Sequence, residues 1–104
     1  MTQKHTFFLR FYDQTDEVVE KCVDEIKRAK TYVIGHEHRT PKISMNLQKP
    51  SHEVVLIAGS EADLKRIARS ATIRGIYDKY ASGKHAHTGV QARKPGQAAF
   101  GWQR

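Results

Sequence analysis

The chain has 104 residues, one cysteine and a net charge of +7, with 38% apolar and 28% charged residues. This length suits one domain with a modest core, and no stretch reaches the roughly 18 apolar residues that a membrane span needs. The polar start is not typical of a secretory signal, and a lone cysteine excludes an internal disulfide, so we expect a soluble cytoplasmic protein.

The charge is distributed unevenly along the chain. Residues 1–64 hold nine Lys or Arg and ten Asp or Glu, whereas residues 65–104 hold nine Lys or Arg and one acid, Asp78. Such asymmetry favours a polyanionic partner, most often nucleic acid or an acidic protein surface. The alternative is that the basic residues only add solubility.

The first predicted element is a strand over residues 4–12, which is rich in aromatic residues and alternates in character. Its odd-numbered side chains share one face, and Phe8, Arg10 and Tyr12 share the other. If that second face is open, its two rings could stack on bases while the guanidinium reaches phosphate. Otherwise the tail, a loop or a second subunit covers the rings.

A helix is predicted over residues 16–30, capped by Asp13 or Thr15, with acids at its start and bases at its end. Its apolar stripe includes Cys22, whose thiol we expect to be buried and unreactive. Three extended segments follow. They cover residues 31–39, 42–48 and 52–58, and the last is apolar on both faces, as in a strand at mid-sheet.

A second helix begins after Ser60, and its apolar phase shifts from Ile73 onward. A bend near Gly75 would turn the later apolar residues inward, because glycine is unfavourable inside a helix. A continuous helix would instead expose a patch containing Ile73, Tyr77 and Tyr80 beside several arginines. We favour the bend.

The predicted order is β-α-β-β-β-α, which indicates an α+β fold: an antiparallel sheet with two helices on one face, as a ferredoxin-like variant. We predict an α+β domain over residues 1–82 and a basic, glycine-containing tail over residues 83–104. A tail of this composition would gain ordered contacts on binding or dock through its aromatic residues.

Two His-x-His pairs, His36 with His38 and His85 with His87, have the spacing of same-face strand ligands. No third ligand stands at a fixed spacing, so we predict solvated histidines, no metal site and no cofactor. An acid–base ribonuclease using His36, His38, Tyr77 or the arginines is a third-ranked alternative, since no motif fixes their geometry.

The sequence therefore predicts a small non-enzymatic nucleic-acid-binding protein, with RNA favoured over DNA because no major-groove reader is visible. The runner-up is a protein–protein interaction module, an inhibitor, adaptor or assembly subunit, that docks on an acidic surface through Ile73, Tyr77 and Tyr80. A homodimer stays open. The predicted nucleic-acid contacts are Phe8, Arg10, Tyr12, Lys65, Arg66, Arg69, Arg74, Lys84, Arg93, Lys94, Trp102 and Arg104.

Overall fold

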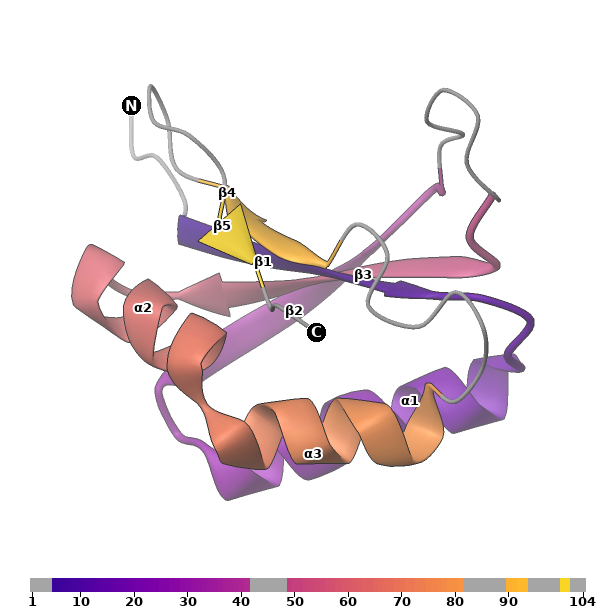
Figure 1. The fold of residues 1–104 in the computed structure, drawn as a ribbon, viewed down its shortest axis with the longest axis horizontal. Helices are drawn as coiled ribbons and strands as arrows, with labels where there is room; N and C mark the ends of the chain where they lie inside the picture. Colours follow the sequence, from indigo (N-terminus) through magenta and orange to yellow (C-terminus); the bar gives the residue numbers. More distant parts are fainter. Residues whose placement is uncertain (1–4, 42–48, 82–89, 94–99, 102–104) are drawn as a thin grey trace.

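The protein is an α+β domain in which helices cover one face of an antiparallel sheet (Figure 1). The computed structural model describes residues 5–41, 49–81, 90–93 and 100–101. Their elements are β1 (His5–Phe11), α1 (Asp16–Ala29), β2 (Val33–Arg39), β3 (His52–Ala58), α2 (Glu61–Arg69), α3 (Ala71–Tyr80), β4 (Gln91–Arg93) and β5 (Phe100–Gly101). The predicted α+β class is confirmed. The strand predicted over residues 42–48 lies outside the described residues.

The sheet has the strand order β2-β3-β1-β4-β5, and all neighbouring strands are antiparallel. The first strand therefore lies at the centre. Phe7 of β1 pairs with Leu56 of β3 on one side and with Ala92 of β4 on the other. β3 also has neighbours on both edges, and its Val54 and Val55 are both fully buried although they face opposite sides.

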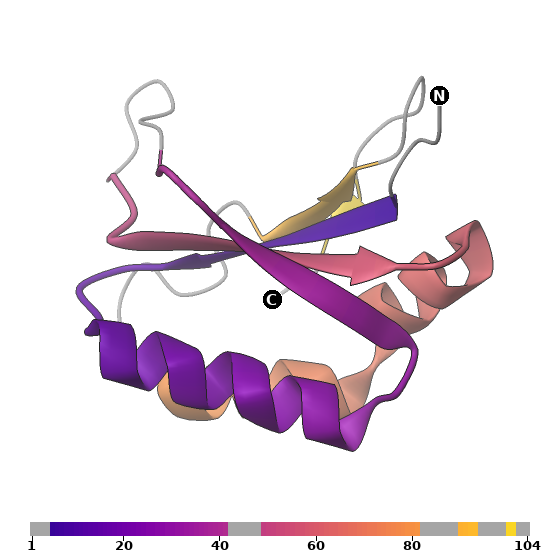
Figure 2. The same cartoon turned by 180° about the vertical axis from the view of Figure 1, so that it is seen from behind.

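The core fills the space between the sheet and the three helices of the described residues. Phe7, Leu9 and Phe11 of β1 are fully buried there, together with apolar residues from α1, α2 and α3. Figure 2 shows α1 and α3 lying beside one another beneath the sheet. Burying each such side chain contributes roughly 1.5–3 kcal/mol, so this single layer is the main source of stability.

The helix boundaries follow from capping. Thr15 accepts a hydrogen bond from the backbone N–H of Val18 and begins α1, and Ser60 accepts one from that of Asp63 and begins α2. The predicted bend at Gly75 is wrong: the break falls at Ser70. Ser70 is extended at φ −74° and ψ 111°, and its hydroxyl accepts from the N–H of Ile73, so it ends α2 and caps α3.

The open aromatic face predicted on β1 is not formed. Phe8 is 9% exposed and Tyr12 is 8% exposed. The guanidinium of Arg39 lies 5.7 Å from the Phe8 ring centroid, and Arg10 Nε is 2.8 Å from Glu53 Oε2 beside Tyr12. Burial raises the pKa of the Tyr12 hydroxyl, an effect that Arg10 opposes and Glu53 reinforces. Two rings buried in this way are not available to stack on bases.

Part of the segment predicted as a tail belongs to the sheet. The strands β4 and β5 both lie within residues 83–104, and Ala92 of β4 is fully buried against the core. No helix in the described part of the chain combines the length and the apolar character needed to cross a bilayer.

Candidate nucleic-acid interface

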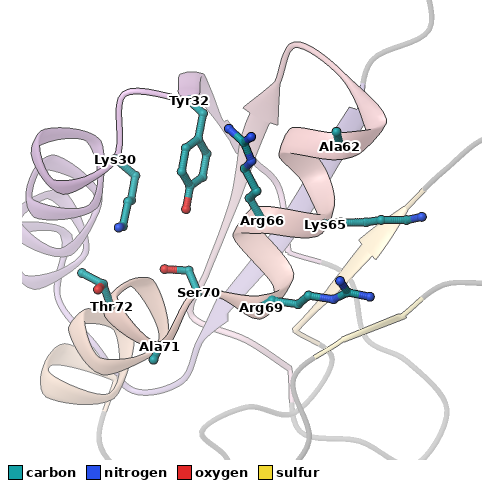
Figure 3. A pocket seen from close by; sticks show the side chains of 9 residues that line it. All are labelled: Lys30, Tyr32, Ala62, Lys65, Arg66, Arg69, Ser70, Ala71 and Thr72. Atoms are coloured by element: carbon teal, nitrogen blue, oxygen red, sulfur yellow. The ribbon is translucent and has the colours of Figure 1, made fainter.

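A basic groove of about 550 Å³ lies where α2 meets α3 and where α1 gives way to β2. Four cationic side chains line it, together with one aromatic ring and two hydroxyl side chains (Figure 3). These residues are Lys30, Lys65, Arg66, Arg69, Tyr32, Ser70 and Thr72. Among the described residues, no acidic side chain lines this groove, so this part of its lining carries a positive charge.

The break at Ser70 shapes the groove, because it turns the start of α3 towards the end of α1. Lys30 follows the last residue of α1, and Tyr32 precedes β2, so one short connection supplies both. On α2, Arg66 and Arg69 stand three residues apart, which brings them to neighbouring positions on the helix. Tertiary packing thus joins residues that are more than 30 positions apart.

Figure 3 shows how the side chains are directed. Arg66 stands beside Tyr32, with its guanidinium carbon 6.0 Å from the ring centroid, and the hydroxyl of Ser70 points into the space near Lys30. Lys65 and Arg69 extend away from Tyr32 on the other side of α2. The cations therefore form a band that begins in the groove and continues over α2.

Two of these four cations form exposed ion pairs, and the other two form none within the described residues. Arg66 lies 3.4 Å from Asp63 and Lys65 lies 3.6 Å from Glu61, and such exposed pairs contribute little. Lys30 and Arg69 form no ion pair within the described residues. A phosphate could therefore replace the exposed carboxylates at small cost.

The start of α3 adds to this charge. Its first turn contains no acidic residue, and Ala71 and Thr72, its first two residues, line the groove. The N–H of Ile73 in this turn is held by the Ser70 hydroxyl, so the start of α3 contributes chiefly the positive end of the helix dipole. This end of the dipole and the cationic side chains lie at one groove, an arrangement that suits a phosphate group.

Four other predicted nucleic-acid contacts within the described residues do not line this groove: Phe8, Arg10, Tyr12 and Arg74. Phe8, Arg10 and Tyr12 lie on the face of the sheet opposite the described helices, where Arg10 is engaged by Glu53. Arg74 is half-buried on α3. Arg93 lies in β4, where its backbone pairs with Thr6. Four further predicted contacts lie outside the described residues: Lys84, Lys94, Trp102 and Arg104.

The apolar patch predicted for a protein partner is not on the surface. Ile73 and Tyr77 are fully buried in the core, because the break at Ser70 rotates α3 so that these side chains face inward. Tyr80 is partly buried and packs against the same core. The predicted interface therefore loses two of its three residues.

Lys30 and Tyr32 were missed by the sequence analysis. The basic last turn of α1, which holds Lys27 and Arg28 just before Lys30, was read only as favourable to the helix dipole. No sequence spacing between these residues and α2 indicates that Lys30 and Tyr32 line the same groove as the residues of α2. The one available signal was an aromatic residue two positions after a lysine, and that signal is weak.

Two histidines also gain a neighbour that their spacing does not show. His38 Nε2 lies 2.9 Å from Glu20 Oε1 of α1, and His36, His38 and Glu20 together could hold a metal ion. The sequence offered no third ligand at a fixed spacing to this pair, and the fold supplies Glu20 from α1. Cys22 is not involved, since it is fully buried and burial raises the pKa of its thiol to about 12.

Comparisons with known proteins supply no relative: no protein-family model matches the chain, and neither the curated proteins nor the solved structures contain a significant match. The basic groove and the distribution of charged residues along the chain are therefore the basis for inferring the function.

Proposed function

We propose that the protein binds single-stranded RNA through the basic groove between α2, α3 and the α1–β2 connection. The observation that supports this proposal most directly is that Lys30, Arg66 and the start of α3 lie around Tyr32, while no carboxylate stands among the described residues of the lining. Cations and helix N–H groups bind phosphate, and an aromatic ring beside them offers a surface on which a base can stack.

The charge of the chain supports the same conclusion. Residues 65–104 hold nine Lys or Arg and one acid, and Lys65, Arg66 and Arg69 form the start of this basic part. The predicted contacts Lys84, Arg93, Lys94, Trp102 and Arg104 would extend the bound path beyond the groove. Each phosphate neutralised adds roughly 0.7 to the salt slope for a single strand, so such a surface would depend strongly on salt.

The strand order also agrees with a sheet of the ferredoxin-like kind, in which β1 and β3 are central and β2 is at an edge. We infer that the protein has this ferredoxin-like architecture and that it positions the residues of the proposed RNA site. The buried lone thiol of Cys22 suits a reducing compartment, and we place the RNA-binding activity in the cytoplasm.

RNA binding is favoured over a protein–protein module because the hot spot proposed for the latter is largely gone. Ile73 and Tyr77 lie in the core, where they stabilise the fold and cannot contact a partner. Exposed arginines and lysines without an apolar centre are typical of nucleic-acid surfaces, and protein interfaces instead need a buried aromatic or aliphatic anchor.

The test compares two triple variants that each lose three positive charges. Lys30→Gln, Arg66→Gln and Arg69→Gln together remove three of the four groove cations, and Lys21→Gln, Arg28→Gln and Lys79→Gln remove cations that do not line it. Affinity for a fluorescent single-stranded RNA is measured by anisotropy between about 50 and 200 mM salt, with DNA of the same sequence in parallel.

We expect the groove variant to lose affinity at least about tenfold and to lower the salt slope by about 2. The control variant should stay within about threefold of the wild type, because its cations do not line the groove. Equal losses in the two variants would show that binding depends on net charge alone and would overturn the groove as the site. An absence of RNA binding at low salt would overturn the function.

A further inference from the structure

Three side chains from two elements bring metal-ligating atoms together at the rim of the domain. Glu20 of α1 and His36 and His38 of β2 each offer one nitrogen or oxygen, and these atoms all lie within 4.8 Å of one another. We propose that this cluster binds a divalent transition metal ion of the zinc class through two imidazoles and one carboxylate. The cluster shares no residue with the basic groove.

The register of the sheet places both histidines on the same face. His36 pairs with Leu56 and His38 pairs with Val54, and both partners face the helices. Residues two apart on a strand point the same way, so both imidazoles are directed to the side on which α1 lies. Their ring centroids are 5.4 Å apart at an interplanar angle of 82°. Because β2 is an edge strand, this side of it is accessible from the rim.

Glu20 completes the cluster from α1, on the side of the sheet that the helices cover. Its neighbour Val19 is buried in the core, and Glu20 itself follows at the margin of the buried stripe, 2.9 Å from His38. The side chains of His38 and Glu20 are 48% and 52% exposed, so both can rotate. A tetrahedral zinc ion with bonds of about 2.0–2.1 Å needs ligand atoms about 3.3 Å apart. Closing the present spread requires movements of about 1–1.5 Å, within reach of such side chains.

The chemistry of the donor atoms also indicates which metal would bind. Two imidazoles with one carboxylate form a donor set that zinc accepts, whereas magnesium and calcium prefer oxygen ligands.

A second feature leaves room for a water ligand. A groove of about 340 Å³ adjoins the cluster and is lined by Asp16, Val19, Glu20, His38 and His52. On its wall, His52 Nε2 lies 2.6 Å from Asp16 Oδ1. Three protein ligands and an open fourth position are typical of zinc sites that bind water or a further ligand, whereas structural zinc sites are closed by four protein ligands.

The experiment titrates the full-length, metal-free protein with zinc against a chromogenic chelator. His36→Ala, His38→Ala and Glu20→Gln should each weaken zinc binding by more than about tenfold, because even the loss of an outer-shell partner costs about 10–100-fold. The matched control is the double variant His85→Ala/His87→Ala, which removes a pair of the same spacing. Glu17→Gln, on the same helix as Glu20, controls for the loss of one negative charge. Both controls should bind zinc as the wild type does.

Cobalt substitution reads out the ligand set independently of affinity. The wild-type protein should give the visible absorption of four-coordinate cobalt, and the spectrum should be lost in His36→Ala. Magnesium should neither compete with zinc nor raise the melting temperature. Glu20→Gln alters a half-exposed side chain, so it tests the site even if a histidine variant fails to fold. Zinc binding that is absent, unchanged in all three variants, or lost only with His85 and His87 would overturn the proposal.

Discussion

The hydroxyl of Tyr77 donates a 2.6 Å hydrogen bond to the backbone carbonyl of Arg10, joining α3 to the central strand. The Tyr77 ring lies 5.4 Å from that of Phe11, at an angle of 48°, so the same side chain also packs against β1. Tyr77 is fully buried. This single residue therefore ties the last described helix to the middle of the sheet.

Tyr77→Phe should lower the free energy of unfolding by about 1–2 kcal/mol, because the ring stays while a buried carbonyl loses its donor. Tyr77→Ala should cost about 3–5 kcal/mol, since a cavity is added to the lost contacts. Urea unfolding followed by circular dichroism measures both. Tyr80→Phe is the control and should change stability by less than about 0.5 kcal/mol. If Tyr77 lay on the surface, all three variants would change the free energy of unfolding by similarly small amounts.

Gly75→Ala should stabilise the protein by about 0.5–1 kcal/mol. Gly75 lies inside α3, and a Cβ built there meets no atom within 4 Å, so alanine gains helix propensity without a clash. A helix that ended at Gly75 would predict destabilisation instead. Thermal unfolding distinguishes stabilisation from destabilisation, and we expect a rise in melting temperature.

Ser70→Ala should instead destabilise the protein by about 1 kcal/mol, because α3 loses its N-terminal cap.

Cys22 should be inert in the native protein and should make stability depend on alkaline pH. Burial, with a smaller contribution from Glu25, raises the pKa of its thiol from 9.0 to about 12. The unfolded chain releases the proton above about pH 9 and the folded one does not, so this contribution to stability is lost as the pH rises from 9 towards 12. The slope approaches about 1.4 kcal/mol per pH unit.

The measurement compares wild type with Cys22→Ala by urea unfolding at several values of pH. Because the two proteins differ only at Cys22, the difference between their free energies of unfolding at each pH isolates the contribution of the thiol. At pH 8 a soluble disulfide reagent should modify Cys22 only at the rate of unfolding. Rapid modification of the native protein, or parallel pH profiles of the two proteins, would contradict a buried thiol.

Glu53→Gln should destabilise the protein by about 3 kcal/mol. Glu53 is 8% exposed on its side chain and holds the guanidinium of Arg10 at 2.8 Å, so the substitution leaves a largely buried charge without its carboxylate. Replacing both Arg10 and Glu53 by leucine should cost less than the sum of the single replacements, because neither charge is then left alone. Additive effects in that double-mutant cycle would mean that the pair is not coupled.

The sequence predicted the elements whose signals are local. The cap at Thr15, the apolar stripe of α1 and the two-faced apolar strand β3 are all encoded within short windows, and each lies where it was predicted. The break at Ser70 was missed because Ser70, Ala71 and Thr72 do not interrupt a helical pattern. The shift of the apolar phase from Ile73 onward indicated a break, and the packing of Ile73 and Tyr77 in the core accompanies its placement at Ser70.

The sites were harder to predict because they join distant parts of the chain. The groove needs Lys30 and Tyr32 to meet Arg66, and the metal cluster needs Glu20 to meet His38. No spacing rule connects such residues, since the contacts arise from how α1 and α2 pack on the sheet. The basic character of residues 65–69 could be predicted, because it is a property of composition.

The central place of β1 has a consequence during synthesis. This strand is synthesised before both of its neighbours in the sheet, because β3 ends at Ala58, 47 residues after Phe11, and β4 ends at Arg93, 82 residues after Phe11. At roughly 5–20 residues per second, its apolar side chains wait for several seconds before both neighbours arrive. The nascent chain is therefore exposed to aggregation in that interval. A chaperone that covers Phe7, Leu9 and Phe11 would prevent aggregation until β3 and β4 have been synthesised.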